Sequence, residues 1–193
     1  MSLNVRNSSN KAGFTLSELL VVMTLFVIIS VGMMTMYSAQ FRLSKNEISL
    51  TDAQAKVKAV INAVLPYVAS ANNILTSTVI NSVTYTSDTD TLVVSLPTVD
   101  NSDEVVEGQS DIVVYNLSGT DLVRIIDAQA SSKRTDGTKT LLSELDDLDF
   151  VYEVEANPAQ STWVNITLTK QVATYNDVNT IDVSNRVFLK NKE

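Results

Sequence analysis

The sequence predicts an α+β chain in which a long N-terminal helix packs on an antiparallel β-sheet. Three observations carry this prediction. Residues 14–37 are almost wholly apolar, residues 38–75 are apolar at helical spacing, and residues 76–193 alternate apolar and polar side chains as strands do. A length of 193 residues is enough to bury a core.

The composition excludes several functions. The chain has no cysteine and no histidine, so a disulfide, a thiol nucleophile, a Cys/His zinc site and a Ser-His-Asp relay are all absent. Its formal net charge of −8 argues against nucleic acid as a partner, because cationic contacts to phosphate dominate that affinity. Paired acidic residues could still serve general acid–base catalysis, but the sequence shows no pocket signal and no positioned partners for them, so we expect neither an enzyme nor a bound cofactor.

The first apolar stretch is typical of a single membrane-spanning helix. Residues 1–13 are polar and contain Arg6 and Lys11, whereas residues 19–36 carry no charge. About 20 apolar residues suffice to cross a bilayer. A cleaved secretory signal peptide is the rival interpretation, but its apolar region is only about 7–15 residues long, and no small-x-small cleavage site follows this one.

Glu18 is the unusual residue, since it is a carboxylate at the edge of the apolar run. An acid within a membrane helix costs about 2.5–3.5 kcal/mol. Either Glu18 lies near the interface and is solvated, or it pairs with a cation from another group. The nearest such cation would be a new amino terminus created by a cut just upstream.

Residues 13–22 read Gly-Phe-Thr-Leu-Ser-Glu-Leu-Leu-Val-Val and resemble the processing motif of type IV pilins and type II secretion pseudopilins. The resemblance implies that prepilin peptidase cuts after Gly13 and that Phe14 becomes the methylated N-terminus. It also implies that Glu18, the fifth residue of the mature chain, takes part in subunit assembly, and that Thr15 does so as well.

One position departs from the family pattern. The family more often has an aliphatic residue just before the glutamate, and this chain has Ser17. The departure changes local packing but leaves the cleavage position and the carboxylate in place.

Charge alone does not orient the span, because two cations flank each end. The resemblance implies a cytoplasmic leader and an extracytoplasmic globular domain, hence a single-pass protein of the cytoplasmic membrane that ends in a pilus or pseudopilus at the cell surface or in the periplasm. The expected divisions are a removed leader (1–13), a transmembrane and filament-core half of the helix (14–37), an amphipathic half (38–75) and the sheet domain (76–193).

The second half of the helix has one apolar face, which we expect to pack on the sheet. Its apolar residues recur at spacings of three, four and seven: Leu50, Ala53, Val57, Val60, Ile61 and Val64. Pro66 is expected to end or kink the helix. Many family members carry a proline in the membrane half, and this chain has none between Phe14 and Pro66.

Period-two alternation predicts strands at 79–86, 91–96, 111–117, 121–127, 148–155, 162–169 and 180–189. Gly119 is expected in a hairpin turn between two of them. One apolar and one polar face per strand indicates a sheet with one wet side. We expect Trp163, the only tryptophan, to fill the core between sheet and helix, with a contact to a neighbouring subunit as the alternative.

Acidic residues cluster in 100–107 and in 144–149. Such clusters are usually solvated surface. The alternative is a calcium site, for which Asp100, Asp103 and Glu104 are the candidate ligands, although their spacing does not match an EF-hand. No metal site is otherwise expected.

The leading functional hypothesis is a structural subunit that polymerises. The long globular part and the absence of a proline in the span favour a minor, priming or tip subunit of a pilus or pseudopilus, and the closing meander with Arg-Val-Phe-Leu-Lys-Asn resembles that of larger minor subunits. Its expected partners are prepilin peptidase, other pilin or pseudopilin subunits and the membrane.

Two alternatives stay open. One is a single-span anchor that presents a binding domain or adhesin and never polymerises. The other is an adhesive or DNA-capturing tip subunit, for which a local basic patch of Lys133, Arg134 and Lys139 would have to overcome the acidic surface.

Overall fold

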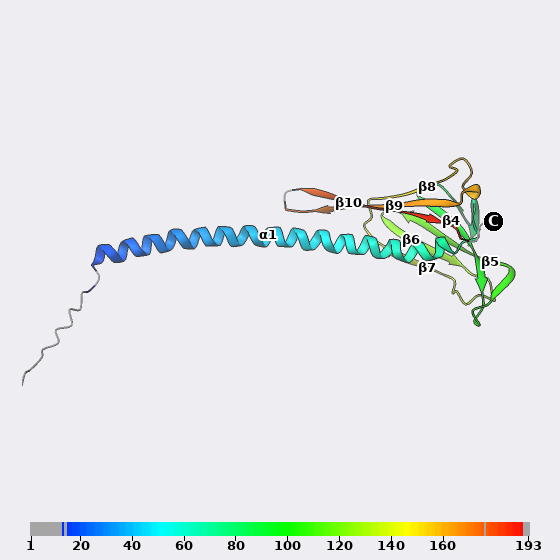
Figure 1. Cartoon of the computed structure of the whole chain (residues 1–193), viewed down its shortest axis with the longest axis horizontal. Coiled ribbons are helices and arrows are strands. Elements are labelled where there is room, and N and C mark those ends of the chain that lie inside the picture. The colour runs from blue at the N-terminus through cyan, green and yellow to red at the C-terminus, as the bar shows by residue number, and fades with distance from the viewer. Residues whose placement is uncertain (1–12, 14, 176, 191–193) are drawn as a thin grey trace, which may run out of the picture. The chain divides into compact units, whose positions relative to one another are not determined.

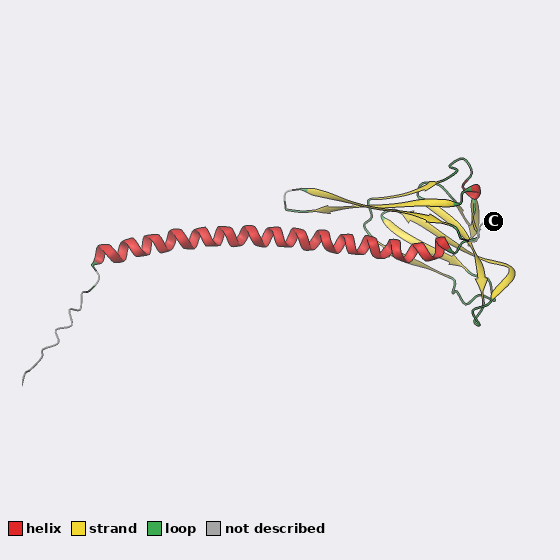
Figure 2. Cartoon of the chain, in the orientation of Figure 1, coloured by secondary structure: helices red, strands yellow, loops and turns green. Residues whose placement is uncertain are grey.

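The computed structural model describes residues 13, 15–175 and 177–190 of the chain. These residues form one long helix, a short 3₁₀ helix and a set of antiparallel strands (Figures 1 and 2). The elements are α1 (Leu16–Ala69), β1 (Asn73–Ile74), β2 (Ser77–Ile80), β3 (Val83–Thr86), β4 (Thr91–Val99), β5 (Val105–Ser118), β6 (Asp121–Asp127), β7 (Gly137–Leu142), β8 (Asp147–Tyr152), η1 (Pro158–Gln160), β9 (Trp163–Ala173) and β10 (Val178–Phe188).

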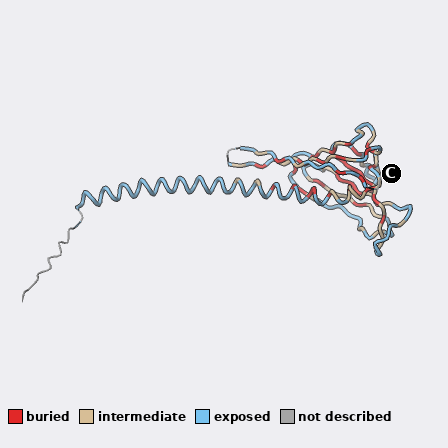
Figure 3. The backbone as a smooth tube through the Cα atoms, in the orientation of Figure 1, coloured by how far each residue is buried: buried red, intermediate tan, exposed pale blue. Residues whose placement is uncertain are grey.

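The chain divides into two compact units, residues up to Lys45 and Asn46–Glu193. The boundary falls within α1, which is 54 residues long. In the first unit the helix is exposed on every side, whereas in the second unit it buries one stripe of side chains (Figure 3). The buried side chains are Ala53, Val57, Val60, Ile61, Val64 and Val68, which confirms the predicted apolar face.

The helix does not end at Pro66 but continues to Ala69. Proline removes one helical donor and crowds the preceding turn. Only one further turn depends on it here, and that turn keeps its bonds because Ser70 N donates to Pro66 O at 3.1 Å. Lys190 N donates to Ala69 O at 3.0 Å and so satisfies a carbonyl at the helix end.

The larger sheet has five strands in the order β1-β4-β5-β6-β7. Leu92, Val94 and Leu96 of β4 face the stripe of α1 and belong to the main core. Val93 lies on the opposite face, in a second cluster with Ile80 and Val114. The expectation of one wet side is therefore wrong for the centre of this sheet, because other apolar side chains cover its second face.

The strand expectations hold for most of the second unit and fail at three places. Residues 79–86 were expected as one strand, but they contain a turn in which Asn81 and Ser82 have φ of 50° and 67°. This two-residue turn joins β2 to β3. Strands β1 and β7 were not predicted. Gly119 does lie in a turn, with φ of 66°, between β5 and β6.

The smaller sheet has three strands in the order β10-β9-β8. Phe150, Ile166 and Leu168 of this sheet share the main core with α1 and the larger sheet. The two sheets are also joined directly, because the Tyr152 hydroxyl donates to Thr91 O at 2.7 Å. The α+β layout predicted from sequence is thus confirmed.

Trp163 does not fill the core. The neighbouring Val164 is fully buried and belongs to the core, so alternation along β9 turns Trp163 to the opposite face. There the Arg186 guanidinium lies over the indole ring, 4.2 Å from its centroid. Phe188, its cross-strand partner, is 60% exposed. The prediction of a core tryptophan is wrong because the even-numbered residues of β9 face the core, and Trp163 is odd-numbered.

A buried carboxylate, Asp111 on β5, fastens the segment between β6 and β7. Its side chain is fully buried and accepts bonds from the Thr98 hydroxyl at 3.1 Å, Gln129 N at 2.9 Å and the Ser132 hydroxyl at 2.7 Å. Arg134 Nη1 completes the set at 2.6 Å. Burial by itself would raise the pKa of Asp111, but these donors together hold that pKa below its ordinary value.

The Asp111 network predicts an acid-sensitive contribution to stability. Asp111→Asn should lower the free energy of unfolding by about 3 kcal/mol near neutral pH, because it breaks a buried ion pair. The pKa of Asp111 is lower in the folded chain than the ordinary aspartate value of 3.8, so this contribution to stability is complete above pH 3.8. It disappears as the pH falls through the pKa of Asp111 in the folded chain. Denaturant unfolding of the full chain in detergent at several pH values measures it.

Asp103→Asn is the matched control, since Asp103 is 77% exposed and pairs with Lys133 at the surface. Its effect should stay below about 1 kcal/mol. Equal stability losses in the two variants would contradict the stabilising role of the buried Asp111 network.

Candidate functional site

The start of α1 is organised by a reciprocal pair of hydrogen bonds between Thr15 and Glu18. Thr15 precedes the first helical residue, and its Oγ1 accepts from Glu18 N at 3.3 Å. In return, Glu18 Oε2 accepts from Thr15 N and from the Thr15 hydroxyl, both at 2.9 Å. This is a capping box, which satisfies two amides that the helix itself leaves without partners.

The capping box also fixes where the Glu18 charge lies. Both described bonds to the carboxylate end on Oε2, and in the described part of the chain no cation lies within ion-pair distance of Glu18. A carboxylate offers about four acceptor positions. The side chain is exposed, so it retains capacity for a donor from outside the chain. The positive end of the helix dipole favours an anion at this position.

Beyond Glu18 the helix is apolar on every side. Its most apolar window of 18 residues has a mean hydropathy of 2.5, and none of that window is buried within the chain. By length and composition α1 is the one described helix that is able to cross a membrane. A helix that is apolar all round needs an apolar environment supplied by lipid or by other chains.

Three hydroxyl groups in this part of the helix bond to its own backbone. Thr24 Oγ1 donates to Leu20 O, and Thr35 Oγ1 donates to Gly32 O, both at 2.8 Å. Ser38 Oγ donates to Thr35 O at 2.8 Å. These bonds remove the cost of placing a hydroxyl donor in an apolar surrounding.

Gly13 lies just before the capping box and is exposed. A Cβ added there would meet no atom within 4 Å, and its backbone does not adopt the left-handed conformation that requires glycine. The fold therefore does not demand glycine at this position. Phe14, the predicted N-terminus and methylation site, lies outside the described residues, as do residues 1–12 of the predicted leader.

The three calcium candidates have other partners. Asp100 Oδ1 accepts from Ser102 N at 2.8 Å and from Glu104 N at 2.9 Å, which closes a turn. Asp103 forms an ion pair with Lys133. Among the residues that the structure describes, no group of three acidic side chains is placed to hold a metal ion. The calcium site stays a prediction from sequence.

Among the predicted site residues, Thr15 and Glu18 are brought together. Both residues are predicted from sequence, but the hydrogen bonds between them are not. The signal was present, because Thr-Leu-Ser-Glu before an apolar run has the Thr-x-x-Glu spacing of a capping box.

Comparison with known proteins finds a family match that covers the start of α1. A family model described as the prokaryotic N-terminal methylation motif matches residues 8–34. The matched segment contains Gly13, the capping box and the first half of the apolar helix. Comparison with curated proteins finds no match.

The capping box predicts a local effect of Thr15→Ala. Loss of an N-cap costs about 1 kcal/mol, so the amides of the first turn, such as Leu19 N, should exchange with solvent about fivefold faster. Hydrogen exchange on the full chain in detergent measures this. Ser17→Ala is the control, since it leaves all three Thr15–Glu18 bonds in place and removes only the contact of the Ser17 hydroxyl with Thr15 Oγ1. Unchanged exchange in Thr15→Ala would rule the box out.

Proposed function

Because the chain carries the N-terminal methylation motif, the signature of type IV pilins and pseudopilins, we propose that it is a structural subunit of a type IV pilus or a type II secretion-type pseudopilus. The observation that carries the proposal is the match over residues 8–34, which joins a polar leader to an apolar helix that no described residue covers. A polymer of such helices would supply the missing apolar surroundings.

In this proposal the chain is a precursor that prepilin peptidase cuts after Gly13, and Phe14 is then methylated. No side chain packs against Gly13, so packing gives no reason for a glycine there. This supports a role for Gly13 in recognition by prepilin peptidase. Processing removes the polar leader and places a cationic amine beside the capping box.

Glu18 then has two functions in succession. Within the subunit it caps α1 through Thr15. During assembly its carboxylate pairs with the N-terminal amine of a neighbouring subunit. Opposite charges attract strongly in a low-dielectric surrounding, but each is costly there alone, so the pair selects the register between subunits more than it adds stability.

The proposal also assigns a place and a class. Residues 14–37 span the cytoplasmic membrane before assembly, and the second unit lies outside the cytoplasm. The aromatic pair of half-buried Trp163 and exposed Phe188 supports a role for the sheet in contacts with sister subunits, since aromatic side chains and Arg are common at protein interfaces. Within the class we favour a minor, priming or tip subunit, and a structural role over an enzymatic one.

The mature N-terminus tests the processing step. Mass spectrometry of the protein expressed with prepilin peptidase should find a chain that begins at methylated Phe14, and expression without the peptidase should leave the leader attached. Gly13→Val is a matched control that should stay uncut while the helix start is intact, because no atom lies within 4 Å of the added Cβ. An uncut chain under both conditions would leave a single-span anchored binding domain instead.

The assembly role of Glu18 is separable from its capping role. Glu18→Ala should be cut and inserted normally but should fall at least about tenfold in the filament fraction, because it leaves the amine of a neighbour unpaired. Thr15→Ala removes the cap that positions the carboxylate but keeps its charge, so it should lose less of the filament fraction than Glu18→Ala. Immunoblots of filament and membrane fractions measure both. Equal loss in the two variants, or full assembly of Glu18→Ala, would contradict the charge-pair role.

A further inference from the structure

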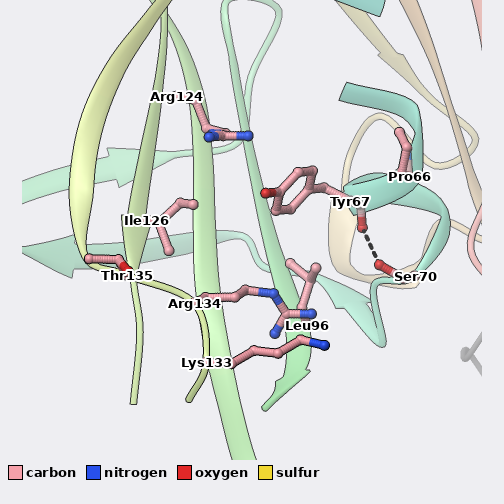
Figure 4. A pocket seen from close by; sticks show the side chains of 9 residues that line it. All are labelled: Pro66, Tyr67, Ser70, Leu96, Arg124, Ile126, Lys133, Arg134 and Thr135. Atoms are coloured by element: carbon pink, nitrogen blue, oxygen red, sulfur yellow. Dashed lines mark hydrogen bonds between the residues drawn. The ribbon is translucent and has the colours of Figure 1, made fainter. Parts of the chain in front are cut away.

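A pocket at the C-terminal end of α1 gathers cations in a chain of net negative charge. Its volume is about 550 Å³, and it is lined by Pro66, Tyr67, Ser70, Leu96, Arg124, Ile126, Lys133, Arg134 and Thr135. We call it the basic pocket, since three of these residues are cationic and no acidic residue is among those that line it. In Figure 4 the three cationic side chains extend from the sheet side toward the helix end that carries Tyr67 and Ser70.

The three cations differ in how far their charge is offset. Arg134 is bound to buried Asp111 and donates to Pro97 O at 2.8 Å, so it is a fixed part of the wall. Lys133 pairs with exposed Asp103, and such surface pairs contribute little, which leaves the amine free to exchange partners. Arg124 has no carboxylate within ion-pair distance in the described part of the chain.

Arg124 is also incompletely satisfied by hydrogen bonds. Its guanidinium lies over the Tyr67 ring, 4.8 Å from the centroid. Its Nε is buried and makes no well-aligned hydrogen bond, although the guanidinium lies close enough to interact with the hydroxyl of fully buried Tyr115, its cross-strand partner. A guanidinium has five N–H donors, so Arg124 keeps donors for a further acceptor.

The strand register adds a further positive charge next to Arg124. Lys139 of β7 is paired directly with Arg124 of β6. Directly opposed residues of an antiparallel pair share a face, and like charges there destabilise the sheet. An anion beside Arg124 would offset this repulsion and would accept from its guanidinium.

The lining limits the kind of anion. Leu96 is fully buried and Ile126 is 8% exposed, so the floor of the pocket is apolar. A volume of this size suits a small organic molecule. Arginine binds the planar oxygens of a carboxylate or a phosphate through two parallel bonds.

We propose that the basic pocket binds a small organic anion. Its carboxylate or phosphate pairs with Arg124 and Lys133, and its apolar part lies on Ile126 and Tyr67. The site is independent of the assembly role of α1, because all its residues lie in the second unit, outside the matched motif.

Isothermal titration of the full chain in detergent tests the site with benzoate, phenyl phosphate and uncharged benzyl alcohol. At least one of the two anions should bind saturably at one site per chain, and benzyl alcohol should not. The tighter of the two anions identifies the acidic group as carboxylate or phosphate. Absence of saturable binding by both anions, or equal binding of the alcohol, would overturn the proposal.

Variants locate the binding. Arg124→Gln should weaken it at least about tenfold, since bonds to charged groups are the stronger ones. Arg186→Gln is the matched control, because it also removes one arginine stacked on an aromatic ring but lies over Trp163, away from the pocket. Lys133→Gln alters only a half-exposed side chain and should weaken binding at least about twofold, which keeps the test decisive should Arg124→Gln fail to fold. Unchanged binding in folded Arg124→Gln or in Lys133→Gln would overturn the assignment.

Discussion

The second unit depends on one packing interaction, that of the apolar stripe of α1 against both sheets. Val57, Val64 and Val68 are almost completely buried and share a single core with β4, β5, β8 and β9. Each sheet alone would leave an apolar face in water, which is unfavourable in proportion to its area. The same stripe positions the last turn of α1, where Tyr67 and Ser70 form one wall of the basic pocket.

One helix serves two different surroundings, and its sequence changes accordingly. From Leu19 to Tyr37 the side chains are exposed on all sides and almost wholly apolar, whereas beyond Asn46 only one stripe is buried. A helix can continue across this change because its backbone bonds are internal in both environments. The charged residue at its start is tolerable for a local reason, since Thr15 binds the Glu18 carboxylate before any partner arrives.

Buried charge plays a different role in the sheet domain. Asp111 holds the segment that carries Lys133 and Arg134 through three hydrogen-bond donors of that segment, so that two cations of an acidic protein stand beside a third, Arg124. Net charge describes the long-range field of a protein, but a local site is decided by which side chains the fold brings together. The Lys133 and Arg134 patch noted in the sequence thus becomes part of a pocket, while Lys139 faces Arg124 from the next strand.

The sequence by itself determined the elements whose signals are local. The apolar run, the stripe from Ala53 to Val64, the Gly119 turn and the motif around Gly13 and Glu18 are all readable within a few residues, because helix and strand periods and capping chemistry act over that range. Tertiary structure alone decided the split of 79–86 into a hairpin, the outward position of Trp163 and the meeting of Arg124 with Tyr67. These depend on strand register and on contacts between distant segments, and a shift of register by one residue exchanges the two faces of a strand.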